Sequence, residues 1–158
     1  MAYWLLKTEA ETFSWDDQVK RGAKGEPWTG VRNFTARGYL KDMKKGDLAF
    51  FYHSGGEDPA ILGIVEIVRE GYPDSTALDP KDPHYDPRSK GGETQWSMVD
   101  IRAVERLSRP VTLSEMRTRA ELSSMPLLQK GQRLSVQKVG AAEWNAVLAL
   151  AKRGEPDT

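Results

Sequence analysis

Cysteine is absent from the 158-residue sequence, and histidine occurs only twice. Without thiols the chain has no disulfides and no thiolate metal site, which excludes a disulfide-stabilised secreted scaffold. No apolar run approaches the roughly 20 residues needed to cross a bilayer. The first seven residues also lack the order of a signal peptide. We therefore expect a cytoplasmic protein that makes no contact with a membrane.

The sequence also lacks the motifs of the common enzyme classes. It contains no phosphate-binding loop, no dinucleotide fingerprint and no nucleophile elbow beside His53. Asp82, His84 and Asp86 alternate along one segment, but two prolines interrupt that segment and no further ligand cluster supports it. No acid–base pair can be identified from spacing. We therefore expect neither catalysis, nor a cofactor, nor a metal site.

Length and composition are those of a globular domain. The charged fraction is 29% and the hydrophobic fraction 39%, which are ordinary values. A chain of this length buries about two-thirds of its unfolded surface. We predict one domain over residues 1–154, followed by a short tail at 155–158.

Charge is balanced overall but unevenly distributed. The net charge is zero, which argues against tight non-specific binding to a polyanion. Residues 20–45 nevertheless hold eight basic residues and two acidic ones, whereas residues 46–100 hold four basic and eleven acidic. This segregation fits a basic face on a neutral molecule. It fits equally well with charge scattered over a solvated surface, and the counts do not decide between the two.

Apolar periodicity predicts five strands and four helices. The expected strands cover residues 3–6, 48–53, 60–68, 96–104 and 134–139. The expected helices begin at Ser14, Asn33, Thr112 and Ala141 and end near Arg21, Met43, Arg119 and Arg153. The second and third strands should form a hairpin because a short loop joins them. The segment 71–93 is rich in proline and aspartate, which is typical of a functional loop.

The helix at 33–43 has a distinct basic side. We expect Phe34, Leu40 and Met43 to point inward, and Arg37, Lys41 and Lys44 to point outward. Strands mixed with helices, without a βαβ rhythm, favour the α+β class. A small mixed or antiparallel β-barrel with peripheral helices would also protect the strand edges.

Polar and aromatic residues recur where the predicted strands and loops end. The set comprises Lys7, Thr8, Trp28, Arg32, Asn33, Tyr52, His53, Ser54, Trp96, Arg133 and Ser135. If these ends converge, they form a pocket with an aromatic wall that suits a nucleobase drawn out of its stack. Each residue alone is more typical of a structural role: Trp28 as a core anchor, Gly30 in a turn and Asn33 as a helix cap.

Four segments carry a family resemblance. They are Tyr3–Glu9 (YWLLKTE), Trp28–Phe34 (WTGVRNF), Lys45–Ser54 (KGDLAFFYHS) and Arg133–Gln137 (RLSVQ), and the segment Met125–Leu128 fits as well. In this order they resemble the signatures of the EVE domain. That family includes small stand-alone bacterial proteins and the thymocyte nuclear protein of eukaryotes, and it is related to YTH domains.

The resemblance implies a PUA-like fold and a reader of a methylated or hydroxymethylated base in DNA or RNA. It assigns pocket positions to Lys7, Thr8, Trp28 and Thr29. Together with the polar and aromatic residues at the other strand and loop ends, we expect a base pocket formed by Lys7, Thr8, Trp28, Thr29, Arg32, Asn33, Tyr52, His53, Ser54, Trp96 and Ser135. Phosphates would be contacted by Arg37, Lys41, Lys44 and Arg133. The candidates for a second aromatic wall are Tyr72, Tyr85 and Trp96. The competing interpretation is a small-molecule or nucleoside-binding protein, or an enzyme, that uses the same pocket, and the sequence gives no indication of oligomeric state.

Overall fold

The computed structural model describes residues 1–9, 11–55, 58–89, 93–131 and 134–152. The strands are β1 (Tyr3–Glu9), β2 (Glu26–Pro27), β3 (Leu48–Ser54), β4 (Ala60–Pro73), β5 (Ser97–Thr112) and β6 (Val136–Val139). The α-helices are α1 (Trp15–Lys20), α2 (Phe34–Asp42), α3 (Leu113–Arg117) and α4 (Ala141–Lys152). The α+β class is thus confirmed. The predicted tail at 155–158 and the candidate Arg133 lie outside the described residues.

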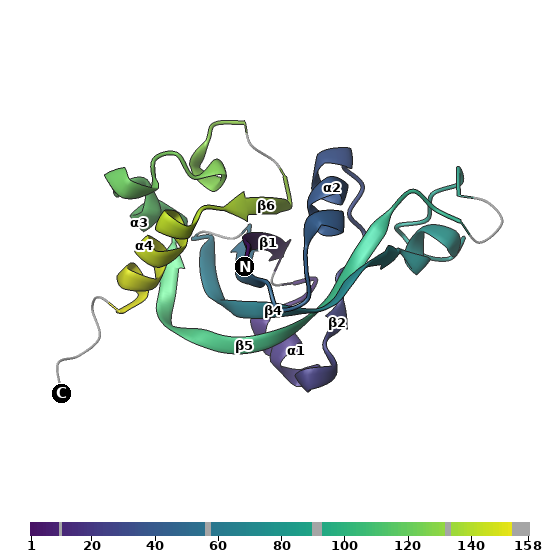
Figure 1. Cartoon of the computed structure of the whole chain (residues 1–158), viewed down its shortest axis with the longest axis horizontal. Coiled ribbons are helices and arrows are strands. Elements are labelled where there is room, and N and C mark those ends of the chain that lie inside the picture. The colour runs from purple at the N-terminus through teal and green to yellow at the C-terminus, as the bar shows by residue number, and fades with distance from the viewer. Residues whose placement is uncertain (10, 56–57, 90–92, 132–133, 153–158) are drawn as a thin grey trace.

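All six strands belong to one sheet in the order β2-β5-β4-β3-β1-β6. β1 and β3 pair in parallel, and the other pairs are antiparallel, including the predicted hairpin of β3 and β4. Figure 1 shows β4 and β5 as long, curved strands that run together across the molecule. Register shifts along their pairing accompany this bend, as β-bulges do.

The expected barrel is wrong, because the sheet does not close. Closure would require the edge strands β2 and β6 to pair with each other, and the strand order leaves them at opposite edges. β2 is only two residues long and ends at Pro27, which has no backbone N–H to donate to a further ladder. The molecule therefore contains a strongly curved open sheet whose edges are short.

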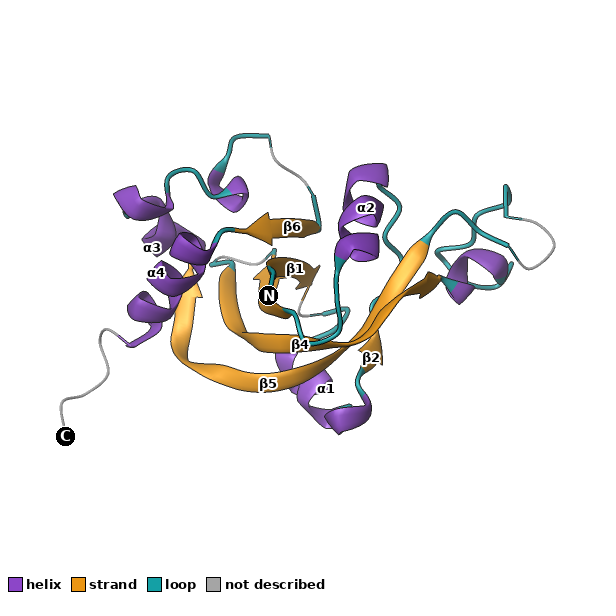
Figure 2. Ribbon diagram, in the orientation of Figure 1, coloured by secondary structure: helices purple, strands orange, loops and turns teal. Residues whose placement is uncertain are grey.

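Side-chain alternation along the central strands produces two cores, one on each face of the sheet. In β1, Trp4 and Leu6 belong to one core and Leu5 to the other. In β3, Phe51 and Phe50 divide in the same way. Because both faces are covered, these strands read as continuous apolar runs. Figure 2 shows α3 and α4 grouped at one end of the curved sheet and α2 toward the other.

The helices begin where the sequence predicts. Ser14, Asn33 and Thr112 each accept a hydrogen bond from a backbone N–H in the first turn of α1, α2 and α3, as N-cap residues do. Within α2, Leu40 is fully buried as predicted. The inward orientation of Phe34 is wrong: Phe34, the first residue of the helix, is 54% exposed. No helix in the described ranges is long and apolar enough to span a membrane.

Candidate functional site

The candidate cavity lies where the Trp28 segment passes the end of β1. β2 pairs with β5, and the Trp28 backbone N–H donates to the Val99 carbonyl at 2.7 Å. These bonds fix the direction of the chain as it leaves the sheet edge. Beside it is a cavity of about 350 Å³, within the range of about 300–1,000 Å³ that is typical of small-ligand sites.

The cavity gathers residues from four separate parts of the chain. Its lining residues are Lys7, Thr8, Thr12, Phe13, Glu26, Pro27, Trp28, Thr29, Gly30, Val31, His84 and Ser135. Five of them, Lys7, Thr8, Trp28, Thr29 and Ser135, are among the residues expected from the sequence. The wall combines three aromatic rings with hydroxyl groups and one ammonium group, which can hold a planar polar ring.

Trp28 serves both the core and the cavity. Its side chain is 8% exposed and meets the Phe51 ring edge-on, with ring centroids 6.1 Å apart and an interplanar angle of 79°. It also lines the cavity. The indole is therefore held rigidly by the core, in a residue that also lines an open space of ligand size.

Lys7 supplies a positive group at the cavity wall. Its backbone N–H donates to the Ser135 carbonyl at 2.9 Å, which draws the β6 end of the chain to β1. The side chain is half-buried, and loss of solvation lowers its pKa from the ordinary lysine value. In the described part of the chain its ammonium group has no hydrogen-bond or ion-pair partner. It is therefore available to a ligand.

The Thr8 hydroxyl makes a hydrogen bond that also fixes the position of Phe13. Its Oγ1 donates to the Phe13 carbonyl at 3.2 Å. That bond ties the turn after β1 to the cavity and places Phe13 on the wall. Because the hydroxyl proton is engaged there, the Oγ1 lone pairs remain free to accept a hydrogen bond.

Asp74, a fully buried residue, organises the segment that closes the cavity. Its carboxylate accepts from the Gly30 N–H at 2.9 Å, from Arg32 Nη1 at 3.0 Å and from Thr76 N–H at 2.9 Å. Burial alone would raise its pKa, but the hydrogen bonds from Thr76, Gly30 and Arg32 together hold that pKa below its ordinary value. The loop after β4 is thereby fastened to the Trp28 segment.

Arg32 and Asn33 are engaged with the protein itself. Arg32 also donates to the His84 carbonyl at 2.7 Å, and its guanidinium carbon lies 5.5 Å from the Trp96 ring centroid. The Asn33 side-chain oxygen accepts from the Ala36 N–H at 3.0 Å as the cap of α2. Through these contacts Arg32 and Asn33 hold the cavity wall next to the start of helix α2.

Tyr52, His53 and Ser54 lie outside the cavity lining. Tyr52 belongs to the core on the opposite face of the sheet. His53 Nε2 accepts from the Trp15 N–H at 3.1 Å, and burial lowers the pKa of His53. Ser54 Oγ donates to the carbonyl of the wall residue Thr8 at 3.4 Å, but Ser54 itself does not line the cavity. Successive residues of β3 point to opposite faces of the sheet, so these three neighbours cannot all line one cavity. The set of pocket residues expected from the sequence did not take this alternation into account.

Trp96 borders an adjacent hollow. This second hollow, of about 280 Å³, is lined by Arg32, Pro83, His84, Tyr85, Asp86, Arg88 and Trp96. The Trp96 indole N–H donates to Asp86 at 2.7 Å, and the hydrogen bonds from Arg88 and Trp96 lower the pKa of Asp86 to about 2. His84 lines both hollows, so they are neighbours. Tyr72 lies elsewhere, with its hydroxyl hydrogen-bonded to Asp100.

Sequence reasoning missed Phe13 and His84 as wall residues. His84 reaches the cavity because Gly30 has no side chain: a Cβ at Gly30 would lie 2.7 Å from His84 Nε2. Gly30 also has a φ of +82°, a conformation that favours glycine. Gly30 therefore indicated in the sequence that another group packs closely against the backbone there. The sequence did not indicate that this group is His84, 54 residues farther along the chain.

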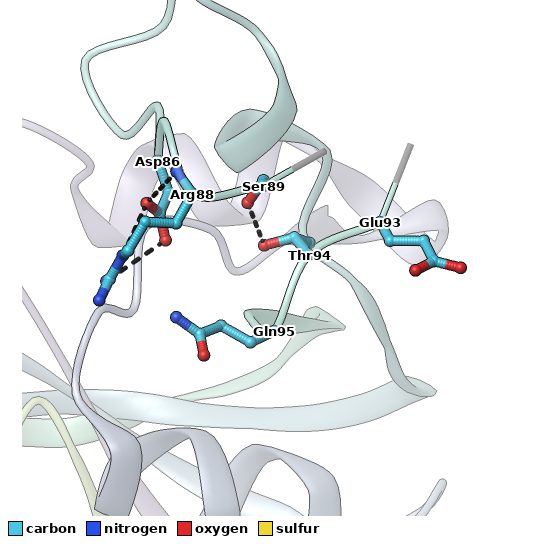
Figure 3. A pocket seen from close by; sticks show the side chains of 6 residues that line it. All are labelled: Asp86, Arg88, Ser89, Glu93, Thr94 and Gln95. Atoms are coloured by element: carbon cyan, nitrogen blue, oxygen red, sulfur yellow. Dashed lines mark hydrogen bonds and ion pairs between the residues drawn. The ribbon is translucent and has the colours of Figure 1, made fainter. Parts of the chain in front are cut away.

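A larger hollow occurs farther along the same loop (Figure 3). It measures about 530 Å³ and is lined by Asp86, Arg88, Ser89, Glu93, Thr94 and Gln95. In Figure 3 Arg88 turns back onto Asp86, and Ser89 donates to Thr94 at 2.8 Å. These described lining residues include no aromatic ring, so the hollow does not suit stacking with a base. Within the described ranges no group of three or more His, Asp or Glu residues could hold a metal.

The geometry defines a small α+β domain with a ligand-sized, aromatic-walled cavity at the edge of a curved sheet. The chain belongs to the EVE domain family, whose model matches residues 2–150. Thymocyte nuclear protein 1 of Gallus gallus is 42% identical over 94% of this chain and 68% of its own length.

Solved structures agree with this assignment. The human THYN1 protein, crystallised in complex with 5-methylcytosine-containing DNA, superposes with a TM-score of 0.91 at 38% identity over 99% of this chain and all of that chain. The YTH domain of Zygosaccharomyces rouxii MRB1, solved with N6-methyladenosine RNA, has a TM-score of 0.56 at 14% identity over 99% of this chain and 88% of that chain. The second likeness is one of fold alone. The family resemblance seen in the sequence is confirmed.

Proposed function

We propose that this protein is a non-catalytic reader of a modified base in DNA or RNA. The observation that carries the proposal is the cavity beside Trp28, which brings the rigidly packed Trp28 together with several hydroxyls and with the Lys7 ammonium, a group without a partner among the described residues. A flipped base would stack on the indole, which is worth about 1–3 kcal/mol. A methyl or hydroxymethyl group on the base would then face Pro27 or Val31.

The polar groups indicate which base edge fits. The Lys7 ammonium can only donate, whereas Thr8 Oγ1 can accept because its proton goes to the Phe13 carbonyl. A base that presents a ring acceptor beside an exocyclic amino group satisfies both. Cytosine and adenine have such an edge. One added methyl in an apolar gap is worth only about 1–3 kcal/mol, so preference for the modified base would be modest.

The relatives support a nucleic-acid ligand. The crystallised chain of human THYN1, which shares this fold throughout, was solved in complex with 5-methylcytosine-containing DNA. Phosphates would lie along α2, where Lys41 and the following Lys44 are exposed, with Arg37 beside them and Arg133 as a further candidate outside the described residues. The Asn33 amide nitrogen would add a donor at the entrance. The cytoplasmic location expected from the sequence stays a prediction.

Binding of matched oligonucleotides with and without a modified cytosine or adenine tests the proposal. We expect Lys7→Met and Trp28→Ala to weaken binding of the modified strand, with Trp28→Ala costing roughly 5- to 150-fold. Because Trp28 also packs on Phe51, each variant needs an unfolding curve. Lys7 is only half-buried, so Lys7→Met keeps the test valid even if Trp28→Ala unfolds.

Two results would decide against the reader. If folded Lys7→Met and Trp28→Ala bind the modified strand as tightly as the parent, the cavity is not the base site. If the free modified nucleoside binds as tightly as the oligonucleotide, the protein is a small-molecule binder instead. The zero net charge is the observation that favours this second function.

A further inference from the structure

Phe34 is a large aromatic residue on the surface. It is the first residue of α2 and is 54% exposed. It is not a loose side chain, because its ring stacks on Trp96 with centroids 5.1 Å apart and an interplanar angle of 22°. Aromatic residues are enriched at contact surfaces relative to the rest of a protein's surface.

The support beneath Phe34 is built from buried groups. Trp96 is 3% exposed, and Asp86 holds its indole N–H at 2.7 Å. The guanidinium carbon of Arg37 lies 4.9 Å from the Phe34 ring centroid, and Arg37 Nη1 donates to the Gln95 carbonyl at 3.3 Å. Phe34 thus presents an exposed ring that the buried Trp96 and the Arg37 guanidinium hold in place, and we call these three residues the Phe34 platform (Phe34, Arg37 and Trp96).

The platform lies close to the base cavity. Phe34 follows Val31, a cavity residue, by three positions, and three residues span at most about 11 Å. The hollow beneath Trp96 also shares His84 with the cavity. Since successive bases on one strand of duplex DNA rise about 3.4 Å each, the platform is within reach of a base one to three nucleotides from the one in the cavity.

We propose that the Phe34 platform is a second nucleotide-binding site, on which a base near the modified one stacks against Phe34 while Arg37 contacts the adjoining phosphate. This inference rests on the proposed function of the cavity. Stacking on an aromatic ring is open to every base, so the platform adds affinity without reading sequence. The arginine beside the ring, followed by Lys41 on the same helix, favours a polyanion over an apolar protein partner.

A fluorescent base, 2-aminopurine, tests the platform when it is placed in turn at each position flanking a modified cytosine or adenine. Stacking on the ring should quench its fluorescence at positions on one side of the modified base only. We expect Phe34→Ala to abolish this quenching and to weaken oligonucleotide binding roughly 5- to 150-fold. Phe34→Tyr should keep both properties, because the ring remains. Val19→Ala is the matched control, since Val19 is 51% exposed on α1.

The outcomes separate the platform from the cavity. If Phe34→Ala binds and quenches like the parent while the parent still prefers the modified strand, the platform is refuted and the reader stands. If the parent shows no preference for a modified base, the proposal of a modified-base reader is refuted. Binding and quenching of Phe34→Ala and the parent on the unmodified strand then decide for or against the platform. If the parent binds no oligonucleotide, both proposals fall. An unfolding curve confirms that each variant is folded.

Discussion

Trp28 shows how one residue can belong to the core and also be a candidate ligand contact. Its edge-on packing against Phe51 fixes the indole, and the cavity borders what remains open. Burial and function therefore do not compete at this position, because the ring needs only one accessible side to stack on a base. Judged by its low exposure alone, Trp28 would have been classed as a core anchor and not considered as a candidate ligand contact.

Gly30 is the residue at which the cavity is most sensitive to a small change. We expect Gly30→Ala to destabilise the fold by about 1–2 kcal/mol, because alanine is strained at a φ of +82°. The added Cβ would also displace the His84 ring from the wall. Urea unfolding measures the first effect and oligonucleotide binding the second.

Gly38 provides the matched control. A Cβ at Gly38 would meet no atom within 4 Å, and the residue lies inside α2. Gly38→Ala should therefore stabilise the protein by up to about 1 kcal/mol, since alanine is the better helix former. If Gly30→Ala proved as stable as the parent and bound equally well, the close packing of Gly30 on His84 would have no role in the site.

His53 should make stability depend on pH. Its Nε2 accepts from the Trp15 N–H, and burial lowers its pKa below the ordinary value of about 6.5. The unfolded chain therefore binds a proton more readily than the folded chain does. The stabilising contribution is complete above about pH 6.5 and is lost as the pH falls through the folded-state pKa.

Urea midpoints measured across this acidic range test the expectation. The parent should lose stability as the pH falls from 7, whereas His53→Gln should show a flatter profile. His84→Gln is the control, because His84 is the other histidine in the sequence. A parent profile that matches that of His53→Gln would mean that the hydrogen bond from Trp15 does not govern acid sensitivity.

At the scale of elements, local chemistry predicted much of the fold. The starts of three helices were predictable from their N-cap residues, whose hydroxyl or amide group caps the first turn: Ser14, Asn33 and Thr112. Apolar runs located five of the six strands. These features depend on near neighbours in sequence, so a single sequence reveals them. β2 was missed because two residues carry no periodicity.

Contacts between distant segments were not predictable. The parallel pairing of β1 with β3 and the bond from Gly30 to Asp74 join residues more than 40 positions apart. The sequence indicated that the loop after β4 was functional, but not that it returns to the Trp28 segment and brings His84 to the cavity. Phe34 was assigned inward because helical periodicity alone does not show that the first residue of a helix is left exposed.

The N-cap of α2 allows a helix effect to be separated from a binding effect. Asn33→Ala should cost about 1 kcal/mol, because the Ala36 N–H would lose its acceptor. Asn33→Ser should restore most of this stability, since serine caps nearly as well, but it removes the amide. Thermal unfolding and oligonucleotide binding are measured on both variants.

These two variants bear directly on the role of Asn33. If Asn33→Ser is stable but binds weakly, the amide contacts nucleic acid as proposed. If Asn33→Ser binds like the parent, Asn33 serves only to start the helix and leaves the list of ligand contacts. An unfolding midpoint of Asn33→Ala equal to that of the parent would contradict the capping role.

For the whole molecule, the open sheet explains how a small domain keeps a cavity. Two cores hold the central strands from both faces, so the sheet edge near β2 is free to carry irregular segments. Asp74, rather than a further strand, fixes those segments in place. The site is therefore assembled from loops on a rigid support, an arrangement that is common for binding sites.

Zero net charge sets a limit on how the molecule can bind a polyanion. Affinity must come from a local basic track rather than from the field of the whole protein, so its salt dependence should be modest and traceable to single residues. We expect Lys41→Ala and Lys44→Ala each to reduce the slope of log affinity against log salt by about 0.7–0.9. Lys152→Ala, at the end of α4 on the other core, should leave the slope unchanged. Equal slopes for all three variants and the parent would show that Lys41 and Lys44 do not contact phosphates, whatever occupies the cavity.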